Sequence, residues 1–103
     1  MPEAAENFSV LLAAEPDNAE AQANYSRVLK TLGRGSEAIA HLEVAVRLQP
    51  EDADLHNELG TMLGRGGKVR EALAQFDEAL RLNPAHEAAR QNAARAQKML
   101  GGN

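Results

Sequence analysis

The chain has 103 residues, enough for one domain, and a domain of this size leaves much of its surface in contact with water. It is 44% hydrophobic and only 3% aromatic, with alanine and leucine as the main apolar residues, so its composition favours helices; the absence of cysteine excludes disulfides and thiolate chemistry. The formal net charge of −4 argues against nucleic acids and anionic membrane surfaces as partners.

Apolar residues recur at helical spacing along the chain, as at Leu42, Ala45 and Val46. Asn18 and Asp52 follow prolines and stand where N-caps are expected, while glycine-rich turns break the pattern elsewhere. The sequence therefore predicts six helices, near 2–14, 19–33, 36–48, 53–65, 69–82 and 87–100.

The chain also contains an internal repeat. The segment EAIA at 37–40 returns as EALA at 71–74, and AVRLQP at 45–50 returns as ALRLNP at 79–84, both at an offset of 34 residues. Repetition at a fixed period of this length is typical of proteins built from stacked helical units, in which each unit buries its apolar face against the next.

The repeated residues resemble the tetratricopeptide repeat. The resemblance is carried at 53–86 by Leu59, Gly60, Leu63, Ala72, Phe76, Ala79 and Pro84, and at 19–52 by Tyr25, Ser26, Leu29, Ala38, Leu42, Ala45 and Pro50. It implies an all-α fold, a right-handed superhelical stack of antiparallel helix pairs. It also implies one domain over 1–103, with a half-repeat at 2–14, full repeats at 19–52 and 53–86, and a capping helix at 87–100.

In this family the first helix of each pair lines a concave groove that binds a protein or peptide. The matching positions in this chain that we expect to form a peptide-binding groove are Asn24, Arg27, Asn57, Glu58, Gln91, Asn92 and Arg95. Asn24 and Asn92 stand where some members carry a ladder of asparagines, and Glu58 interrupts that ladder. An asparagine amide both donates and accepts, which suits a peptide backbone. The alternative is a merely solvated polar face.

A second binding mode of the family fits poorly. Members that grip the C-terminal carboxylate of heat-shock chaperones place lysine, asparagine, asparagine, lysine and arginine at set groove positions. The corresponding residues here are Ala23, Arg27, Glu58, Ala88 and Asn92. They would offer a carboxylate one cation and one repelling acid, so capture of a chaperone tail is not expected.

No catalytic, metal or cofactor site is predicted, and the chain is not expected to be an enzyme. The glycine-rich stretch 64–69 lacks the spacing of a phosphate-binding loop and ends in Val69, where a hydroxyl would be needed. His41, His56 and His86 show no helical spacing that would bring two ligands together.

The two ends of the chain suggest self-association. Helix 2–14 lacks a first helix as partner, so Phe8, Val10, Leu11 and Leu12 are expected to be partly uncovered. Residues 1–52 carry nine acids and four bases, a net −5, while 53–103 carry six acids and seven bases, a net +1. Head-to-tail or helix-swapped oligomers would complete the missing pair. Alternatively, the chain is a piece of a longer protein that supplies the cover.

The leading functional expectation is a protein-interaction scaffold that binds a peptide or a partner helix in its groove. The alternatives are a self-assembling structural module, or a docking segment of a larger enzyme such as a glycosyltransferase. The acidic start and the absence of an apolar run of about 20 residues favour a cytoplasmic setting.

Overall fold

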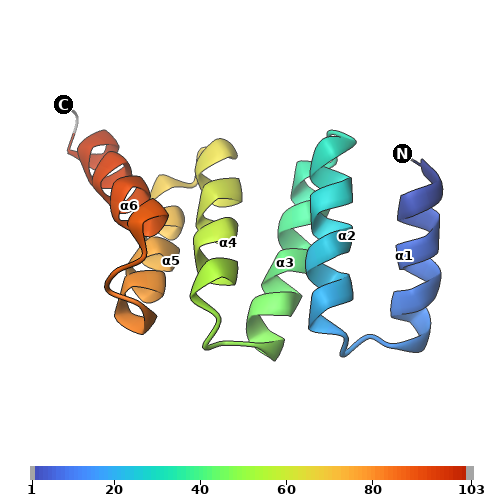
Figure 1. The fold of residues 1–103 in the computed structure, drawn as a ribbon. Helices are drawn as coiled ribbons and strands as arrows, with labels where there is room; N and C mark the ends of the chain where they lie inside the picture. Colours follow the sequence, from blue (N-terminus) through green and yellow to red (C-terminus); the bar gives the residue numbers. More distant parts are fainter. Residues whose placement is uncertain (1, 102–103) are drawn as a thin grey trace. The chain divides into compact units, whose positions relative to one another are not determined.

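The structure, a computed structural model, describes residues 2–101, with side chains from residue 5 onward. This part of the chain forms helices and no strands: α1 (Pro2–Ala14), α2 (Ala19–Thr31), α3 (Gly35–Leu48), α4 (Ala53–Arg65), α5 (Val69–Leu82) and α6 (Glu87–Leu100) (Figure 1). The predicted all-α class is confirmed. Among the described residues, no helix has the length and apolar character that crossing a membrane requires.

One turn differs from the prediction. Helix α2 ends at Thr31 and α3 begins at Gly35, whereas the sequence predicted an end at residue 33 and a start at residue 36. Gly33 has φ of +79°, the left-handed conformation that closes a helix, and the N–H of Arg34 bonds back to the carbonyl of Leu29 at 2.9 Å. Gly67 has φ of +83° and ends α4 in the same way, one period later.

The predicted N-caps are confirmed. Asn18 Oδ1 accepts a hydrogen bond from the N–H of Ala21 at 2.9 Å, and Asp52 Oδ1 accepts one from the N–H of Leu55 at 3.1 Å. Each side chain satisfies a backbone donor that has no partner inside its helix, which fixes where α2 and α4 begin.

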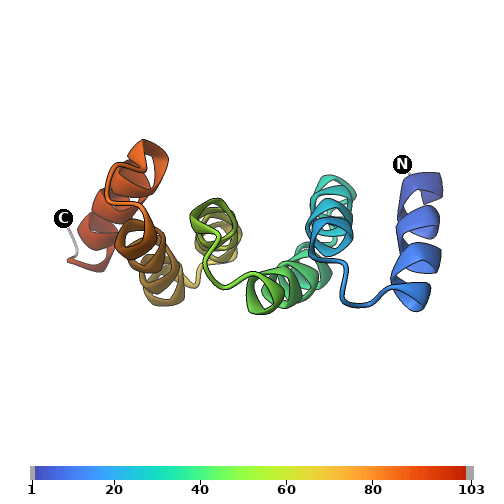
Figure 2. The same ribbon diagram turned by 60° about the horizontal axis from the view of Figure 1, so that its bottom comes forward.

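The chain divides into two compact units, Met1–Pro50 with α1 to α3 and Glu51–Asn103 with α4 to α6. In the first unit α2 packs on α3 and α1 packs on α2. In the second, α4 packs on α5 and α6 packs mainly on α5, with a smaller contact to α4. Figure 2 shows the members of each pair, α2 with α3 and α4 with α5, beside one another.

Two equivalent core positions carry different residues in the two helix pairs. In the second unit Gly60 presents bare backbone to the Phe76 ring, and a Cβ there would lie only 2.5 Å from Phe76 Cε1. The residues one period earlier are Ser26 and Leu42, both completely buried. The first unit thus has the larger residue on its first helix and the smaller one on its second, which keeps the buried volume similar in the two units.

A histidine and a glutamine bridge each helix pair. His41 Nδ1 lies 2.7 Å from Gln22 Oε1 between α3 and α2, and His56 Nδ1 lies 2.8 Å from Gln75 Oε1 between α4 and α5. An amide oxygen only accepts, so Nδ1 carries the proton in both bridges. The two bridges occupy the same repeat positions with the residue types exchanged.

Burial lowers the pKa of His41 below its ordinary value, an effect that the nearby Glu37 carboxylate partly opposes. Gln22 and His56 are also buried. No buried side-chain nitrogen or oxygen in the described part of the chain lacks a partner, so the polar groups between the helices are satisfied.

Candidate functional site

Helices α4 and α6 carry five of the residues predicted to line a groove. Asn57 and Glu58 lie on α4, and Gln91, Asn92 and Arg95 lie on α6. Asn92 Nδ2 donates to Asn57 Oδ1 at 3.0 Å, and Arg95 Nη1 donates to Asn92 Oδ1 at 3.4 Å. Three of these residues are therefore linked in one chain of hydrogen bonds that joins α4 to α6.

The other two members of the five lie outside that chain of hydrogen bonds. Gln91 is exposed, and its side chain donates to Glu87 Oε1 over a long 3.5 Å. Glu58 is half-buried on α4.

Asn24 and Arg27 lie on α2 in the first unit. Arg27 Nη1 donates to Asn24 Oδ1 at 2.7 Å, the same pairing that Arg95 and Asn92 make two periods later. In both cases the arginine donates to the amide oxygen of the asparagine, which leaves the amide N–H groups as the donors available to another partner. The sequence pattern of asparagine followed three residues later by arginine thus marks a repeated local arrangement.

The residues predicted to support self-association are mostly packed within their own unit. Phe8 stacks on Tyr25 with ring centroids 6.1 Å apart, Leu12 is buried and Leu11 is half-buried. Val10 alone of these four is strongly exposed, at 73%.

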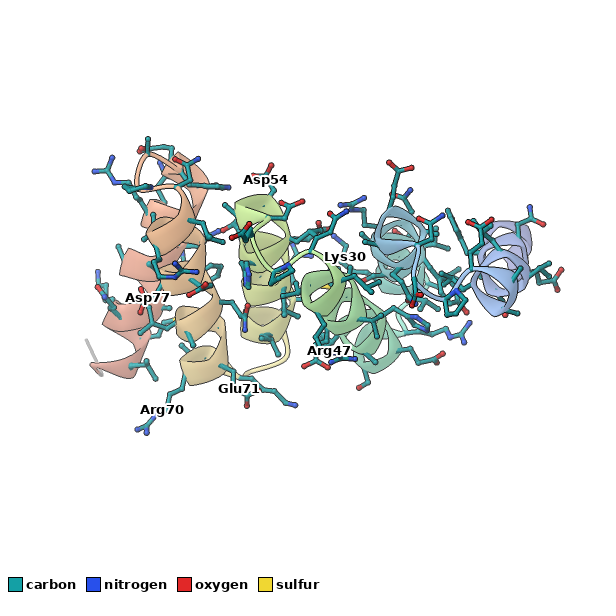
Figure 3. The ribbon with its side chains drawn as sticks, turned by 90° about the horizontal axis from the view of Figure 1, so that it is seen from below. Lys30, Arg47, Asp54, Arg70, Glu71 and Asp77 are labelled. Atoms are coloured by element: carbon teal, nitrogen blue, oxygen red, sulfur yellow. The ribbon has the colours of Figure 1, made fainter. Side chains whose placement is uncertain are left out.

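His86, which lies between the predicted helices 69–82 and 87–100, has a structural role that the sequence did not indicate. Its Nδ1 accepts from the N–H of Ala89 at 3.1 Å and caps α6, while its Nε2 lies 2.8 Å from Asp54 Oδ1. The Asp54 side chain, at the surface of α4 in Figure 3, is 88% exposed. This one imidazole therefore fixes the start of α6 relative to the start of α4.

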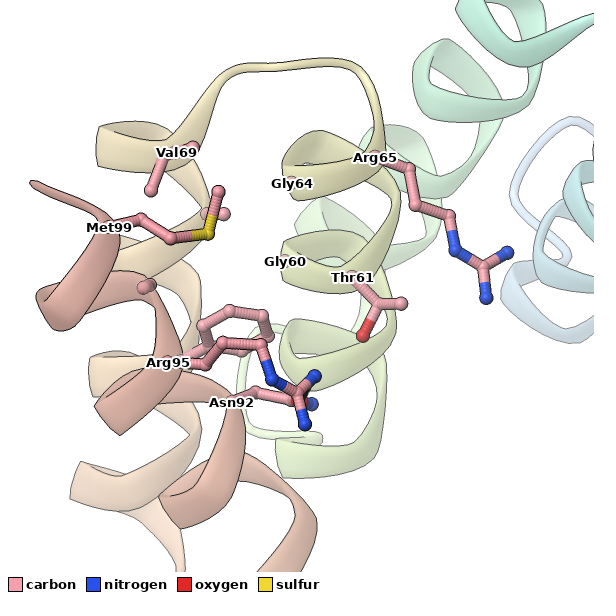
Figure 4. Close-up of a pocket in the computed structure, with 11 residues that line it drawn as sticks. Gly60, Thr61, Gly64, Arg65, Val69, Asn92, Arg95 and Met99 are labelled. Carbon is pink, nitrogen blue, oxygen red and sulfur yellow. Dashed lines mark hydrogen bonds between the residues drawn. The ribbon is translucent and has the colours of Figure 1, made fainter. Parts of the chain in front are cut away.

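A pocket between α4, α5 and α6 was not anticipated from the sequence. Its volume is about 270 Å³ (Figure 4). Phe76, Ala72 and Ala96 are its buried apolar lining residues, and Gly60 and Gly64 contribute bare backbone from α4. The remaining lining residues are Thr61, Arg65, Val69, Asn92, Arg95 and Met99. Asn92 and Arg95 therefore belong both to the pocket lining and to the hydrogen bonds that join α4 to α6.

The charged groups of this pocket are cationic. Two arginines are its only charged lining residues, and it contains no carboxylate, histidine or other group suited to proton transfer. Within the part of the chain that the structure describes, no three histidine or carboxylate side chains come together as a metal site would require.

Helix pairs that recur every 34 residues define a helical-repeat protein. Family models of the tetratricopeptide repeat match residues 1–59 and residues 53–86. The chain belongs to the tetratricopeptide repeat family, whose repeats are protein-interaction modules.

Solved structures share this fold. Two crystal structures of MamA are each 21% identical to the chain. The first has a TM-score of 0.88, and the match covers 94% of this chain and 57% of the MamA chain. The second has a TM-score of 0.90, and the match covers 97% of this chain and 55% of the MamA chain. The first tetratricopeptide repeat domain of Spaghetti (RPAP3), bound to the HSP90 peptide SRMEEVD, is 18% identical with a TM-score of 0.86, over 94% of this chain and 77% of its own. The chain thus spans little more than half of MamA, and these likenesses concern the fold. Among curated proteins, none matches the sequence.

Proposed function

We propose that this chain is an interaction module that binds an extended peptide across α4 and α6. The observation that carries the proposal is the hydrogen-bonded row of Asn57, Asn92 and Arg95 beside the pocket. A row of amides next to an apolar hollow offers backbone hydrogen bonds and a place for a side chain, the two elements of peptide recognition.

The amide row can exchange partners at low cost. The hydrogen bond between Asn92 and Asn57 joins two half-buried side chains, and the one between Arg95 and Asn92 is long at 3.4 Å. A peptide backbone that replaced these bonds with its own would conserve their number, so little of its binding free energy would be lost in breaking them. Asn24, held by Arg27 on α2, is a second donor of the same kind in the first unit.

The RPAP3 structure with its HSP90 peptide supports a peptide as the class of partner. The residues of this chain at the positions associated with chaperone-tail capture do not favour that particular peptide. Ala23 is 3% exposed, and Glu58 would repel a carboxylate. We therefore expect a peptide that is recognised along its length, without a requirement for a free C-terminus.

Selection from a phage-displayed library of random peptides would test the proposal. The dissociation constant of an enriched synthetic peptide would be measured by fluorescence anisotropy for the wild type, for Asn92→Ala and for the double variant Asn24→Ala/Asn92→Ala. Loss of a peptide hydrogen bond should weaken binding about fivefold to tenfold at Asn92. Gln97→Ala, a change at an exposed position of α6 outside the pocket, is the matched control.

Two results would contradict this function. One is a library that yields no specific peptide for the wild-type chain. The other is an enriched peptide that binds the double variant and the wild type with equal affinity, because the amide row would then have no part in recognition.

Self-association is the second candidate. It is favoured by the exposure of apolar residues on the two terminal helices, Val10 at 73% on α1, and Met99 at 59% and Leu100 at 42% on α6. Light scattering across protein concentration would show growth in mass that Val10→Ser reduces. A mass that stays at one chain throughout would exclude this candidate.

A further inference from the structure

We propose that the pocket between α4, α5 and α6 holds one aliphatic side chain of an acidic peptide, whose neighbouring carboxylate pairs with Arg95. This inference rests on the proposed function and names the chemistry of the peptide. It is carried by the size of the pocket, by a glycine whose missing side chain keeps the pocket open, and by the charge at its edge.

The size of the pocket fits a side chain better than a free small molecule. Its volume of about 270 Å³ lies just below the range of roughly 300–1,000 Å³ that is usual for small-molecule sites. Phe76, Ala72 and Ala96 give it an apolar interior, and each is less than 5% exposed. Burial of a leucine- or methionine-sized group there would remove apolar surface from water on both partners.

Gly64 is the second observation. A Cβ at Gly60 would collide with the Phe76 ring, so packing inside the unit requires that glycine. A Cβ at Gly64 would meet only the Ala72 Cβ, at an ordinary contact distance of 3.8 Å. Glycine weakens a helix relative to alanine, and the fold of this unit does not require it at residue 64. Its effect is to leave the wall of the pocket open to an incoming side chain.

The edge of the pocket is cationic. Arg95 reaches from α6 to the mouth of the pocket beside Asn92 and Thr61 (Figure 4), where its contact with Asn92 is the long one of 3.4 Å. Arg65 lies at the edge with its guanidinium turned outward (Figure 4), and the lining includes no aspartate or glutamate.

The carboxylates at the other end of these helices are already engaged. Asp54 at the start of α4 contacts His86, and Glu87 at the start of α6 contacts Arg90. An acidic residue next to the buried side chain would meet Arg95, whose hydrogen bond to Asn92 is long at 3.4 Å, and could form a charge-assisted hydrogen bond with it.

A set of short blocked peptides of designed sequence would test this inference with the full chain. The central residue is leucine, methionine, serine or lysine, and the flanking residues are all glutamate, all glutamine or all lysine. Binding would be followed by chemical-shift changes of backbone amides on titration, which detect weak affinities and locate the site. We expect the glutamate-flanked leucine and methionine peptides to bind most tightly and to shift the amides of Gly64, Ala72 and Ala96.

Two variants separate the apolar and the charged parts. Gly64→Leu fills the pocket and should remove the preference for a central leucine over serine, with a loss of about tenfold in affinity. Arg95→Gln should remove the preference for glutamate over glutamine in the flanks and reduce the salt dependence of binding. The controls are Gly35→Ala, a glycine position in the other unit with open space around it, and Lys98→Gln, a cation on α6 outside the pocket. Both should bind as the wild type does.

Failure of this inference is distinct from failure of the proposed function. The proposed specificity for an acidic peptide would be overturned if lysine-flanked peptides bound more tightly than glutamate-flanked ones. The proposed specificity for an aliphatic side chain would be overturned if leucine and serine peptides bound with equal affinity. Shifts confined to α2, or unchanged binding by Gly64→Leu, would overturn the pocket as the site while leaving peptide binding intact. Absence of binding by every designed peptide while library-selected peptides bind would also overturn it. Absence of binding by either set would overturn the proposed function as well.

Discussion

Replacement of Gly60 by alanine should destabilise the protein, although alanine is the better helix former. The change would normally gain about 0.8–1 kcal/mol from helix propensity. In this structure the added Cβ would lie 2.5 Å from Cε1, 2.7 Å from Cδ1 and 3.0 Å from Cζ of Phe76, whose side chain is 4% exposed and cannot turn away into solvent. Overpacking of this kind costs about 1–3 kcal/mol, so we expect a net loss of about 1 kcal/mol.

The first unit shows how the loss can be relieved. One period earlier, the position equivalent to Gly60 is Ser26, which carries a Cβ, and the position equivalent to Phe76 is the smaller Leu42; both are buried. Phe76→Leu alone should leave a small cavity and cost about 1 kcal/mol. In the double variant the new methyl group occupies part of that cavity, so the two losses should not add, with a coupling of about 1 kcal/mol.

The assay is urea denaturation followed by far-ultraviolet circular dichroism on the two single variants and the double variant. Gly35→Ala is the control, because a Cβ there has no neighbour within 4 Å and should be neutral or stabilising. Equal or greater stability of Gly60→Ala relative to the wild type would refute the steric argument. Strict additivity in the double variant would refute the proposed relief.

Three further predictions concern stability and pH. Gly64→Ala should raise the free energy of unfolding by about 0.5–1 kcal/mol, because the new methyl group makes only an ordinary contact with Ala72; a loss in urea denaturation would contradict this. Asp52→Ala should cost about 1 kcal/mol through loss of the cap on α4, measured in the same way, while Asp17→Ala in an exposed linker should change little. The pKa of His41 is lowered by burial, so the folded state favours the neutral ring: its contribution to stability is present above the unfolded value of 6.5 and declines as pH falls below it toward the folded pKa. Titration of its ring protons by NMR should give a midpoint under 6.5, and a higher midpoint would show that burial does not control this side chain.

The helices could be predicted because their signals are local. Asn18 and Asp52 cap helices through bonds to residues three positions away, and the 34-residue period placed the helix pairs. The one misplaced turn, at Gly33, was also a local matter, since the sequence alone did not identify which glycine takes positive φ. The same period also predicted that Asn92 and Arg95 lie on a helix equivalent to the first helix of a repeat.

The pocket could not be predicted because it depends on volumes contributed by three helices. The sequence shows both Gly60 and Gly64. It does not show that the Phe76 ring leaves no room for a Cβ at residue 60, while residue 64 has room for one. A comparison of equivalent positions does contain part of the signal, since the pair of Gly60 with Phe76 replaces that of Ser26 with Leu42. The cap formed by His86 was likewise missed, because imidazole is not among the usual capping groups.

The exchanged bridges between histidine and glutamine give each helix pair an identity of its own. If α2 folded against α5, two amides, Gln22 and Gln75, would meet where one amide and one ring belong; if α4 folded against α3, His56 would meet His41. The first hybrid would underfill its site and the second would overfill it. Repeats of the same fold in one chain risk such crossed assembly while they fold. In this protein the exchanged bridges would favour correct assembly, because only the native pairings join one ring to one amide.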